Sequence, residues 1–176
     1  MDLEETVPLS PSPTAEETAA PGGPAPDLPR AGRLLGVDVG QRRIGLAISD
    51  ETQWLATPLQ VVQRSARAED FRRLAHIAAE RRVVGLVIGH PLNADGSEGP
   101  QGRTVARYAR HLAETLGLPW VLWDEHGSTQ AALERLAHAG RRRRQMPVDA
   151  EAAAVILQDY LDSRRAGPPA APEDPV

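Results

Sequence analysis

The chain contains neither cysteine nor lysine among its 176 residues. Without cysteine there can be no disulfide framework, Cys-based zinc site, iron–sulfur cluster or cysteine nucleophile. The apolar runs are only a few residues long, far short of the roughly 20 residues that cross a bilayer. The N-terminus has no basic segment followed by an apolar core. We therefore expect a soluble, cytoplasmic protein with no membrane partner.

Charge is distributed unevenly along the chain, whose formal net charge is −4. Residues 1–30 hold seven prolines and six acidic residues against one arginine, and residues 166–176 hold four prolines, two acidic residues and no base. These compositions favour disordered tails around a single domain at residues 31–165. That domain has 19 arginines against 16 acidic residues, a mild positive charge that permits nucleic-acid contact without requiring it.

The apolar pattern predicts three strands in succession, followed by helices that alternate with strands. We expect strands at residues 33–39, 43–50, 57–63, 83–89 and 119–123, and helices at 66–82, 101–116, 128–139 and 148–165. The strand at 83–89 is continuously apolar, so we expect it to be central and buried on both faces. This order is typical of an α/β fold in which a mixed five-stranded sheet, an antiparallel meander plus parallel strands, is flanked by helices.

Asp38 lies in the most apolar part of the first predicted strand. An ionised carboxylate at such a position needs a cation or a metal ion as its partner. Gly36 and Gly40, two positions away on the same face, predict room for a ligand next to Asp38. The alternative is a structural salt bridge from Asp38 to Arg42 or Arg43.

Three more acidic residues lie at the ends of predicted elements. Asp124 and Glu125 follow the last strand, where α/β sheets place their ligand sites. Because side chains alternate along a strand, only one of the two shares the face of Asp38, and the sequence does not say which. Asp149 begins the last helix on its apolar face, so its carboxylate should point toward the sheet, although the position also suits a helix N-cap.

Carboxylates from a first strand, a strand end and a last helix can hold divalent cations. Hard oxygen ligands favour Mg²⁺ or Mn²⁺, and two such ions can activate water and stabilise the leaving oxygen in phosphodiester hydrolysis. The five histidines show no zinc-binding spacing. The acidic residues therefore form a candidate metal site for cleavage of nucleic acid.

Four motifs stand in the order and spacing of a known family. They are GVDVGQRRIGLAISD (36–50), GHPLNADGS (89–97), DEHGST (124–129) and VDAEAAAVILQDYL (148–161). Together they resemble the YqgF/RuvX family of RNase H-like proteins, whose members are described as pre-16S rRNA nucleases and as Holliday junction resolvases. The resemblance covers residues 33 to about 165 and implies an RNase H-like fold.

The resemblance also implies roles for individual residues. Asp38 would be the first metal ligand, Glu125 the second and Asp149 the third, with Asp124 as an additional candidate. His126 stands where the family usually has arginine, and a leucine of the family pattern is likewise replaced by histidine at position 90. Since histidine is charged only below about pH 6.5, we expect weaker phosphate contact or activity at neutral pH.

Basic and polar residues near these acids are expected to contact nucleic acid. Four consecutive arginines before the last helix fit a flexible strip that binds the phosphate backbone without sequence choice, and their alternative is a solvated loop. Aromatic residues make up only 3% of the chain, which argues against extensive base stacking. The candidate nucleic-acid-binding residues are Arg42, Arg43, Asn93, His126, Arg141, Arg142, Arg143 and Arg144.

Together, sequence and resemblance predict a metal-dependent nuclease that uses Mg²⁺ or Mn²⁺ to process the 5′ end of pre-16S rRNA in ribosome biogenesis. A resolvase-like endonuclease acting on branched DNA is the first alternative; it would usually work as a C₂ dimer, and the sequence leaves monomer and homodimer open. A non-catalytic nucleic-acid-binding protein is the second alternative. An actin-like phosphotransferase is disfavoured, because the predicted domain supplies one lobe and has no GxxxxGK[ST] loop.

Overall fold

The structure, a computed structural model, describes residues 27–124 and 147–166. Its elements are β1 (Arg33–Val39), β2 (Arg43–Ser49), β3 (Ala56–Gln63), α1 (Arg67–Glu80), β4 (Val83–His90), α2 (Pro100–Leu116), β5 (Trp120–Asp124) and α4 (Val148–Ala166). Their bounds differ from the predicted ones by at most two residues. The helix predicted at 128–139 lies outside the described residues. No helix in the described ranges is long and apolar enough to cross a membrane.

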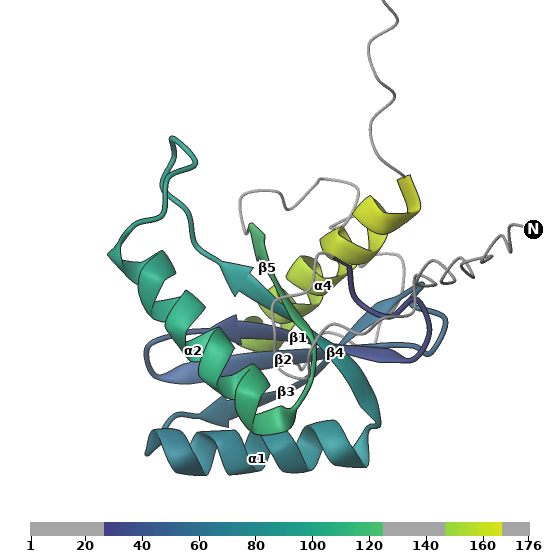
Figure 1. Cartoon of the computed structure of the whole chain (residues 1–176), viewed down its shortest axis with the longest axis horizontal. Coiled ribbons are helices and arrows are strands. Elements are labelled where there is room, and N and C mark those ends of the chain that lie inside the picture. Colours follow the sequence, from purple (N-terminus) through teal and green to yellow (C-terminus); the bar gives the residue numbers. More distant parts are fainter. Residues whose placement is uncertain (1–26, 125–146, 167–176) are drawn as a thin grey trace, which may run out of the picture.

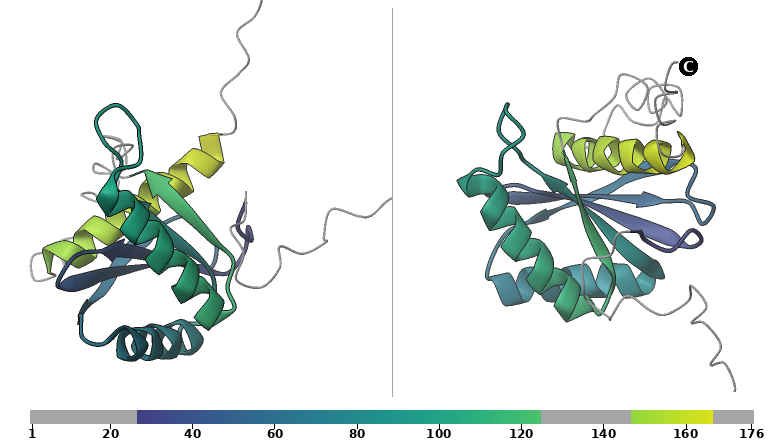
Figure 2. Two further views of the ribbon diagram at one scale, coloured as in Figure 1. Left: turned by 60° about the vertical axis from the view of Figure 1, so that its left-hand side comes forward. Right: turned by 45° about the horizontal axis from the view of Figure 1, so that its top comes forward.

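The sheet is mixed and five-stranded, as predicted, with the strand order β3-β2-β1-β4-β5. The first three strands form an antiparallel meander, and β4 and β5 then continue the sheet parallel to β1. Helices α1 and α2 cover one face, and α4 covers the other (Figures 1 and 2). The prediction that residues 83–89 form the central strand was wrong: β1 occupies the middle, and β4 is the interior strand beside it.

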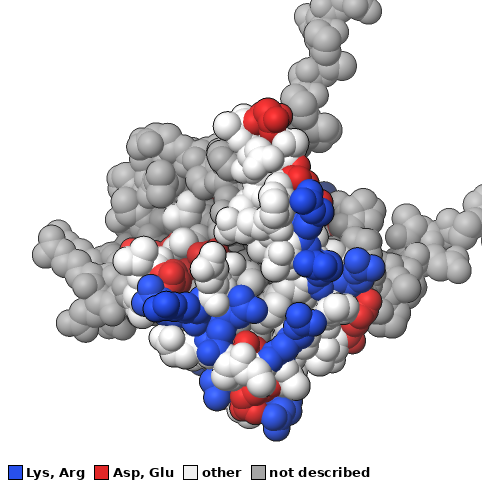
Figure 3. Space-filling model, turned by 90° about the vertical axis from the view of Figure 1, so that its left-hand side faces the viewer, with Lys and Arg blue, Asp and Glu red and all other residues white. Residues whose placement is uncertain are grey.

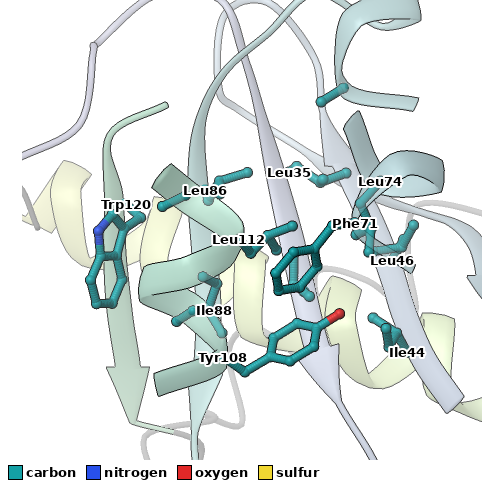
Figure 4. Packing of buried hydrophobic residues seen from close by; sticks show 14 of the residues in the cluster. Leu35, Ile44, Leu46, Phe71, Leu74, Leu86, Ile88, Tyr108, Leu112 and Trp120 are labelled. Atoms are coloured by element: carbon teal, nitrogen blue, oxygen red, sulfur yellow. The ribbon is translucent and has the colours of Figure 1, made fainter. Parts of the chain in front are cut away.

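The larger apolar cluster lies between the sheet and the α1–α2 layer (Figure 4). Phe71 of α1 and Tyr108 of α2 meet edge to face with their ring centroids 5.0 Å apart. Leu35 and Val37 of β1 point into this cluster and are fully buried. Because strand side chains alternate, the intervening residues of β1 point toward α4.

The smaller cluster lies under α4, whose inward face includes Ala153, Leu157 and Leu161, as the sequence predicted. A Cβ at Gly36 would come within 2.8 Å of the Leu157 Cβ, so Gly36 allows α4 to pack directly on β1. The space predicted for a ligand beside Asp38 is therefore taken, at this glycine, by the helix.

The segment just before β1 is part of the domain, although the sequence assigns residues 27–30 to the N-terminal tail. Leu28 is only 2% exposed and packs in the cluster under α4. The guanidinium of Arg164 donates to the Leu28 carbonyl oxygen at 2.7 Å and forms an ion pair with Asp27 at 2.9 Å. Residues 27–30 therefore belong to the domain, and Arg164 near the end of α4 holds them in place.

Candidate active site

Two of the predicted site residues, Asp38 and Asp149, meet on the α4 face of the sheet. Asp38 pairs in register with Gly45 of β2. A Cβ at Gly45 would come within 1.9 Å of the Asp149 carbonyl oxygen, so the first turn of α4 rests on the bare backbone of β2. Glycine in a strand interior marks such a close approach. The pairing of Asp38 with Gly45 therefore brings the two acidic residues side by side.

The electrostatics of Asp38 differ from those expected of a structural ion pair. Burial raises the pKa of the Asp38 carboxyl, and the negative charge of Asp149 raises it further. Within the described part of the chain, Asp38 has no cationic partner. The salt bridge considered between Asp38 and Arg42 or Arg43 is not formed.

Arg43 pairs with Asp149 instead. Its Nε atom lies 2.9 Å from the Asp149 Oδ2 atom. That contact lacks hydrogen-bond geometry, so Oδ2 is a buried oxygen with no hydrogen-bond donor among the described residues. The Asp149 carboxylate also accepts no backbone N–H in these ranges, and the N–H groups of Ala150 and Glu151 instead donate to the Pro147 carbonyl. The N-cap alternative for Asp149 was therefore wrong.

This donor set fits a divalent cation. Two carboxylates lie close together; among the described residues, one has no cationic partner and the other has a buried oxygen that no hydrogen-bond donor satisfies. Carboxylate oxygens are the ligands that hard divalent cations prefer. The residues that the structure describes contain no group of three metal-ligating side chains, and Glu125, the remaining predicted ligand, lies outside them.

The end of β5 places Asp124 on the sheet face away from Asp38. The Trp123 Nε1–H group donates to the Asp159 Oδ2 atom of α4 at 2.8 Å, so Trp123 faces α4. Asp124 is the next residue in the strand and therefore points to the opposite face from Asp38. Its register partner His90 lies on that same opposite face, toward α2. The structure thus does not bring Asp124 to the site.

His90, which replaces the usual leucine of the family pattern, binds the loop that precedes α2. Its Nε2 atom lies 3.0 Å from Glu98 Oε1. A Cβ at Gly102 would come within 3.1 Å of the same nitrogen, so the ring is seated against the start of α2. This histidine therefore connects β4 to the first turn of α2 and does not line the site.

Asn93 is engaged within the loop of residues 91–99. Its backbone N–H donates to the Ser97 carbonyl at 2.8 Å, and its side-chain amide donates to the Ser97 hydroxyl at 2.9 Å. The Ser97 hydroxyl and backbone N–H both bind Asp95, and they hold the pKa of that carboxyl below its usual value. Gly96 has a φ of +79°, which favours glycine at the tip. The loop is therefore a closed turn, and a nucleic-acid contact by Asn93 stays a prediction.

The arginines predicted to bind nucleic acid differ in what the structure shows of them. Arg42 is exposed in the turn after β1, and Arg43 is half exposed beside Asp149. His126 and Arg141 to Arg144 lie outside the described residues.

Two residues that position the site were missed in the sequence. Gly45 could have been found, because a glycine inside an apolar strand indicates close backbone approach. Arg64 carries no such signal; its Nη1 group donates to the Gly40 carbonyl at 2.9 Å and holds the turn that follows Asp38.

Comparison with known proteins places these features in a family. A family model described as "RuvX: Holliday junction resolvase" matches residues 32–163. The chain belongs to the RuvX family. A RuvX-family relative from Cereibacter sphaeroides, named pre-16S rRNA nuclease, is 47% identical over 137 residues, which cover 77% of this chain and 86% of the relative. A relative of the same name from a Bradyrhizobium species is 45% identical over 136 residues, 76% of this chain and 84% of the relative.

Solved structures agree with the RuvX assignment at the level of the fold. The structure "T. thermophilus RuvC in complex with Holliday junction substrate" superposes with a TM-score of 0.57 and 17% identity, covering 77% of this chain and 96% of that one. A second Thermus thermophilus RuvC structure has a TM-score of 0.51 and 18% identity, with coverages of 76% and 96%. The predicted RNase H-like fold is thereby confirmed. Family and fold together support a phosphodiester-hydrolysing enzyme.

Proposed function

We propose that this RuvX-family chain is a divalent-metal-dependent nuclease whose site is built on Asp38, Glu125 and Asp149. The observation that carries the proposal is the juxtaposition of Asp38 and Asp149 on the α4 face of the sheet. The raised pKa of Asp38 and the unsatisfied Oδ2 atom of Asp149 indicate that a positive ligand belongs between them. The Arg43 guanidinium compensates the charge of Asp149 but leaves that of Asp38 without a cationic partner among the described residues.

Asp38 and Asp149 would hold Mg²⁺ or Mn²⁺, with Glu125 as the third ligand. When bound, such a cation supplies the positive charge that stabilises the developing negative charge of phosphodiester hydrolysis. Arg43 holds the Asp149 carboxylate from the solvent side, at 2.9 Å. Because the Arg43 side chain is 54% exposed, it can also meet a phosphate oxygen of the substrate.

For the substrate we propose RNA, at the 5′ end of pre-16S rRNA, which would place the enzyme with ribosome precursors in the cytoplasm. The names of relatives at 45–47% identity support this choice. Branched DNA is the second candidate, supported by the description of the matching family model. We further propose that the exposed Arg42, the arginines at 141–144, His126 and Asn93 contribute contacts to the nucleic acid.

The test is cleavage by the wild type and by Asp38→Asn, in Mg²⁺ and in Mn²⁺. One substrate is an RNA fragment that spans the 5′ leader and mature start of 16S rRNA, and the other is a four-way DNA junction. Thermal unfolding of the variant shows that it is folded. Glu80→Gln, which neutralises an exposed acid on α1, serves as the matched control.

Metal-dependent cutting of the RNA that is lost in Asp38→Asn and kept in Glu80→Gln would support the proposal. Symmetric cutting of the junction, with the RNA left intact, would replace it with the resolvase function. If neither substrate is cut although both bind, the protein is a non-catalytic binder and the proposal fails.

A further inference from the structure

Helix α2 carries a row of arginines that the site does not use. Arg103, Arg107 and Arg110 are spaced by four and three residues and therefore lie on one face of the helix, which we call the arginine face. All three side chains are exposed, and within the described residues none forms an ion pair. They line a shallow groove of about 450 Å³ together with neighbours that include Thr104 and Glu98.

Folding of α2 does not explain these arginines. The helix is anchored by its opposite face, where Val105, Ala109 and Leu112 are buried. Like charges at spacings of three and four residues destabilise a helix. Glu98, the acidic residue in the groove, is engaged by His90 at 3.0 Å and offers the arginines only its backbone carbonyl, at 3.1 Å from Arg103 Nη1. The exposed Glu114, four residues after Arg110, lies on the same face of the helix. The arginine face therefore has three arginines against Glu98 and Glu114, an excess of positive charge, and none of the three is ion-paired within the described residues.

Arg64 connects this helix to the turn beside the candidate active site. Its Nη1 group donates to the carbonyl of Gly40, two residues after Asp38, and its guanidinium lies 5.3 Å from the ring centroid of Tyr108. Tyr108 is buried on the inward face of α2 and follows Arg107 of the arginine face in the chain. Figure 3 shows several arginine side chains on this side of the molecule, with acidic side chains between them. Arg64 thus links the β1–β2 turn to the body of α2, which carries the arginine face on its exposed side.

We propose that the arginine face of α2 binds consecutive backbone phosphates of the RNA strand that extends from the Asp38–Asp149 site around the β1–β2 turn. This proposal rests on the proposed function, because it concerns the same bound strand. At 1.5 Å per residue the arginine face extends about 10 Å along the helix. At the axial spacing of about 3.4 Å per nucleotide in one strand of a duplex, that length covers about three phosphates.

Guanidinium groups suit this role because their planar fork binds phosphate oxygens in pairs. The contacts carry no sequence information, which agrees with the scarcity of aromatic side chains for base stacking. The arginine face therefore adds affinity for the RNA strand and orients it, and other contacts determine the position of cleavage.

The experiment compares two triple variants, both in the Asp38→Asn background so that the RNA is not cut. The test variant is Arg103→Gln/Arg107→Gln/Arg110→Gln. The matched control is Arg33→Gln/Arg72→Gln/Arg81→Gln, which removes the same charge. Arg33 and Arg72 are already paired with Glu51 and Glu69, and Arg81 follows the last residue of α1. Glutamine keeps a high helix propensity.

Binding is measured by fluorescence anisotropy of a labelled single-stranded RNA of about 20 nucleotides over a range of salt concentrations. Each phosphate contact in a single strand adds about 0.7 to the slope of log affinity against log salt, so the test variant should lose about 2 from that slope. Its affinity at low salt should fall at least about tenfold, whereas the control should keep the slope. Both variants should unfold at the temperature of the parent, since exposed surface positions contribute little stability.

An unchanged slope in the test variant, or an equal loss in both variants, would overturn the proposal. Failure of the proposed function is distinguishable, because binding is measured without catalysis. If the wild type cuts RNA but the slope is unchanged, the arginine face fails and the nuclease stands. If the wild type cuts nothing while the slope falls only in the test variant, the arginine face stands and the nuclease fails.

Discussion

The backbone carbonyl of Asp149 occupies the space that a side chain at Gly45 would fill. Their separation, 1.9 Å from the carbonyl oxygen to an ideal Cβ at position 45, leaves no room for any residue other than glycine. Since Gly45 pairs with Asp38, the same contact determines where the start of α4 lies and which carboxylates meet. A residue with no functional group thus sets the geometry of the candidate site.

Gly45→Ala should therefore displace the first turn of α4. We expect a loss of about 1–3 kcal/mol in the free energy of unfolding, typical of overpacking, together with loss of most cleavage activity. Urea unfolding and the cleavage assay measure the two effects. Gly85→Ala is the control, because a Cβ at that strand glycine meets only side-chain ends at 3.2 Å or more, so cleavage should be kept. Equal activity in the two variants would contradict the role of Gly45.

Asp38→Asn should stabilise the metal-free protein while it abolishes cleavage. The amide removes a charge that is disfavoured by burial and by Asp149, so the melting temperature should rise by a few degrees. Because the folded-state pKa of Asp38 is raised, the wild type loses stability as pH rises from the ordinary aspartate pKa through this raised value. The gain in the variant should grow over the same pH interval. A lower melting temperature at neutral pH would contradict the electrostatic account.

Divalent cations should reverse this order of stability. A ligand at 100 times its dissociation constant stabilises the folded state by about 2.7 kcal/mol, so Mg²⁺ or Mn²⁺ should raise the melting temperature of the wild type. The rise in melting temperature should be much smaller in Asp38→Asn, and in Glu80→Gln it should equal that of the wild type. Equal responses in all three proteins would place any metal binding away from Asp38.

Asp124 and Glu125, adjacent in the sequence, should respond differently to neutralisation. Asp124 follows Trp123, which is bonded to α4, and therefore points away from Asp38. We expect Asp124→Asn to keep most of the cleavage activity. Glu125→Gln should lose it by a factor of about 100, since even the outer-shell partners of a metal site contribute roughly 10–100-fold. Single-turnover cleavage rates distinguish the two. The reverse outcome would assign Asp124 as the ligand.

Asp50 should make stability depend on pH on the acid side. Burial raises the pKa of its carboxyl, but the N–H of Leu55, the hydroxyl of Thr52 and the N–H of Trp54 outweigh this and leave the pKa below its ordinary value. Such a group stabilises the fold above the ordinary aspartate pKa, and the stabilisation is lost as pH falls through the lowered one. Asp50→Ala should cost about 1 kcal/mol at neutral pH, and the difference should shrink toward pH 3 in acid titrations of the melting temperature. A constant difference would contradict the assignment.

Arg164 should contribute strongly to stability. Its guanidinium donates to the Leu28 carbonyl at 2.7 Å and to Gln53 Oε1 at 2.9 Å, and it pairs with Asp27. Arg164→Ala should lower the free energy of unfolding by about 2–3 kcal/mol, because polar groups near the buried Leu28 lose a charged donor. Urea unfolding measures the effect, and Arg81→Ala, at an exposed position, should be near neutral. Similar losses in both variants would show that the N-terminal segment does not depend on this contact.

The sequence by itself determined the local elements and the family. Continuous or amphipathic apolar patterns predicted every helix and strand of the described ranges to within two residues, because periodicity reports which side of an element is buried. An aspartate in an apolar strand identified Asp38, and the apolar face of the last helix predicted that Asp149 points toward the sheet. Four motifs identified the family. These signals are local in the sequence, so they can be recognised without knowledge of the tertiary structure.

Only the tertiary structure decided which of these residues meet. The partner of Arg43 is Asp149 and not Asp38, Gly36 makes room for Leu157 and not for a ligand, and the middle strand is β1. Each outcome depends on where α4, distant in sequence, lies on the sheet, or on the order in which the strands pair. A single sequence records periodicity along the chain, whereas contacts between distant segments depend on how whole faces pack against one another, and that packing exists only in the folded molecule.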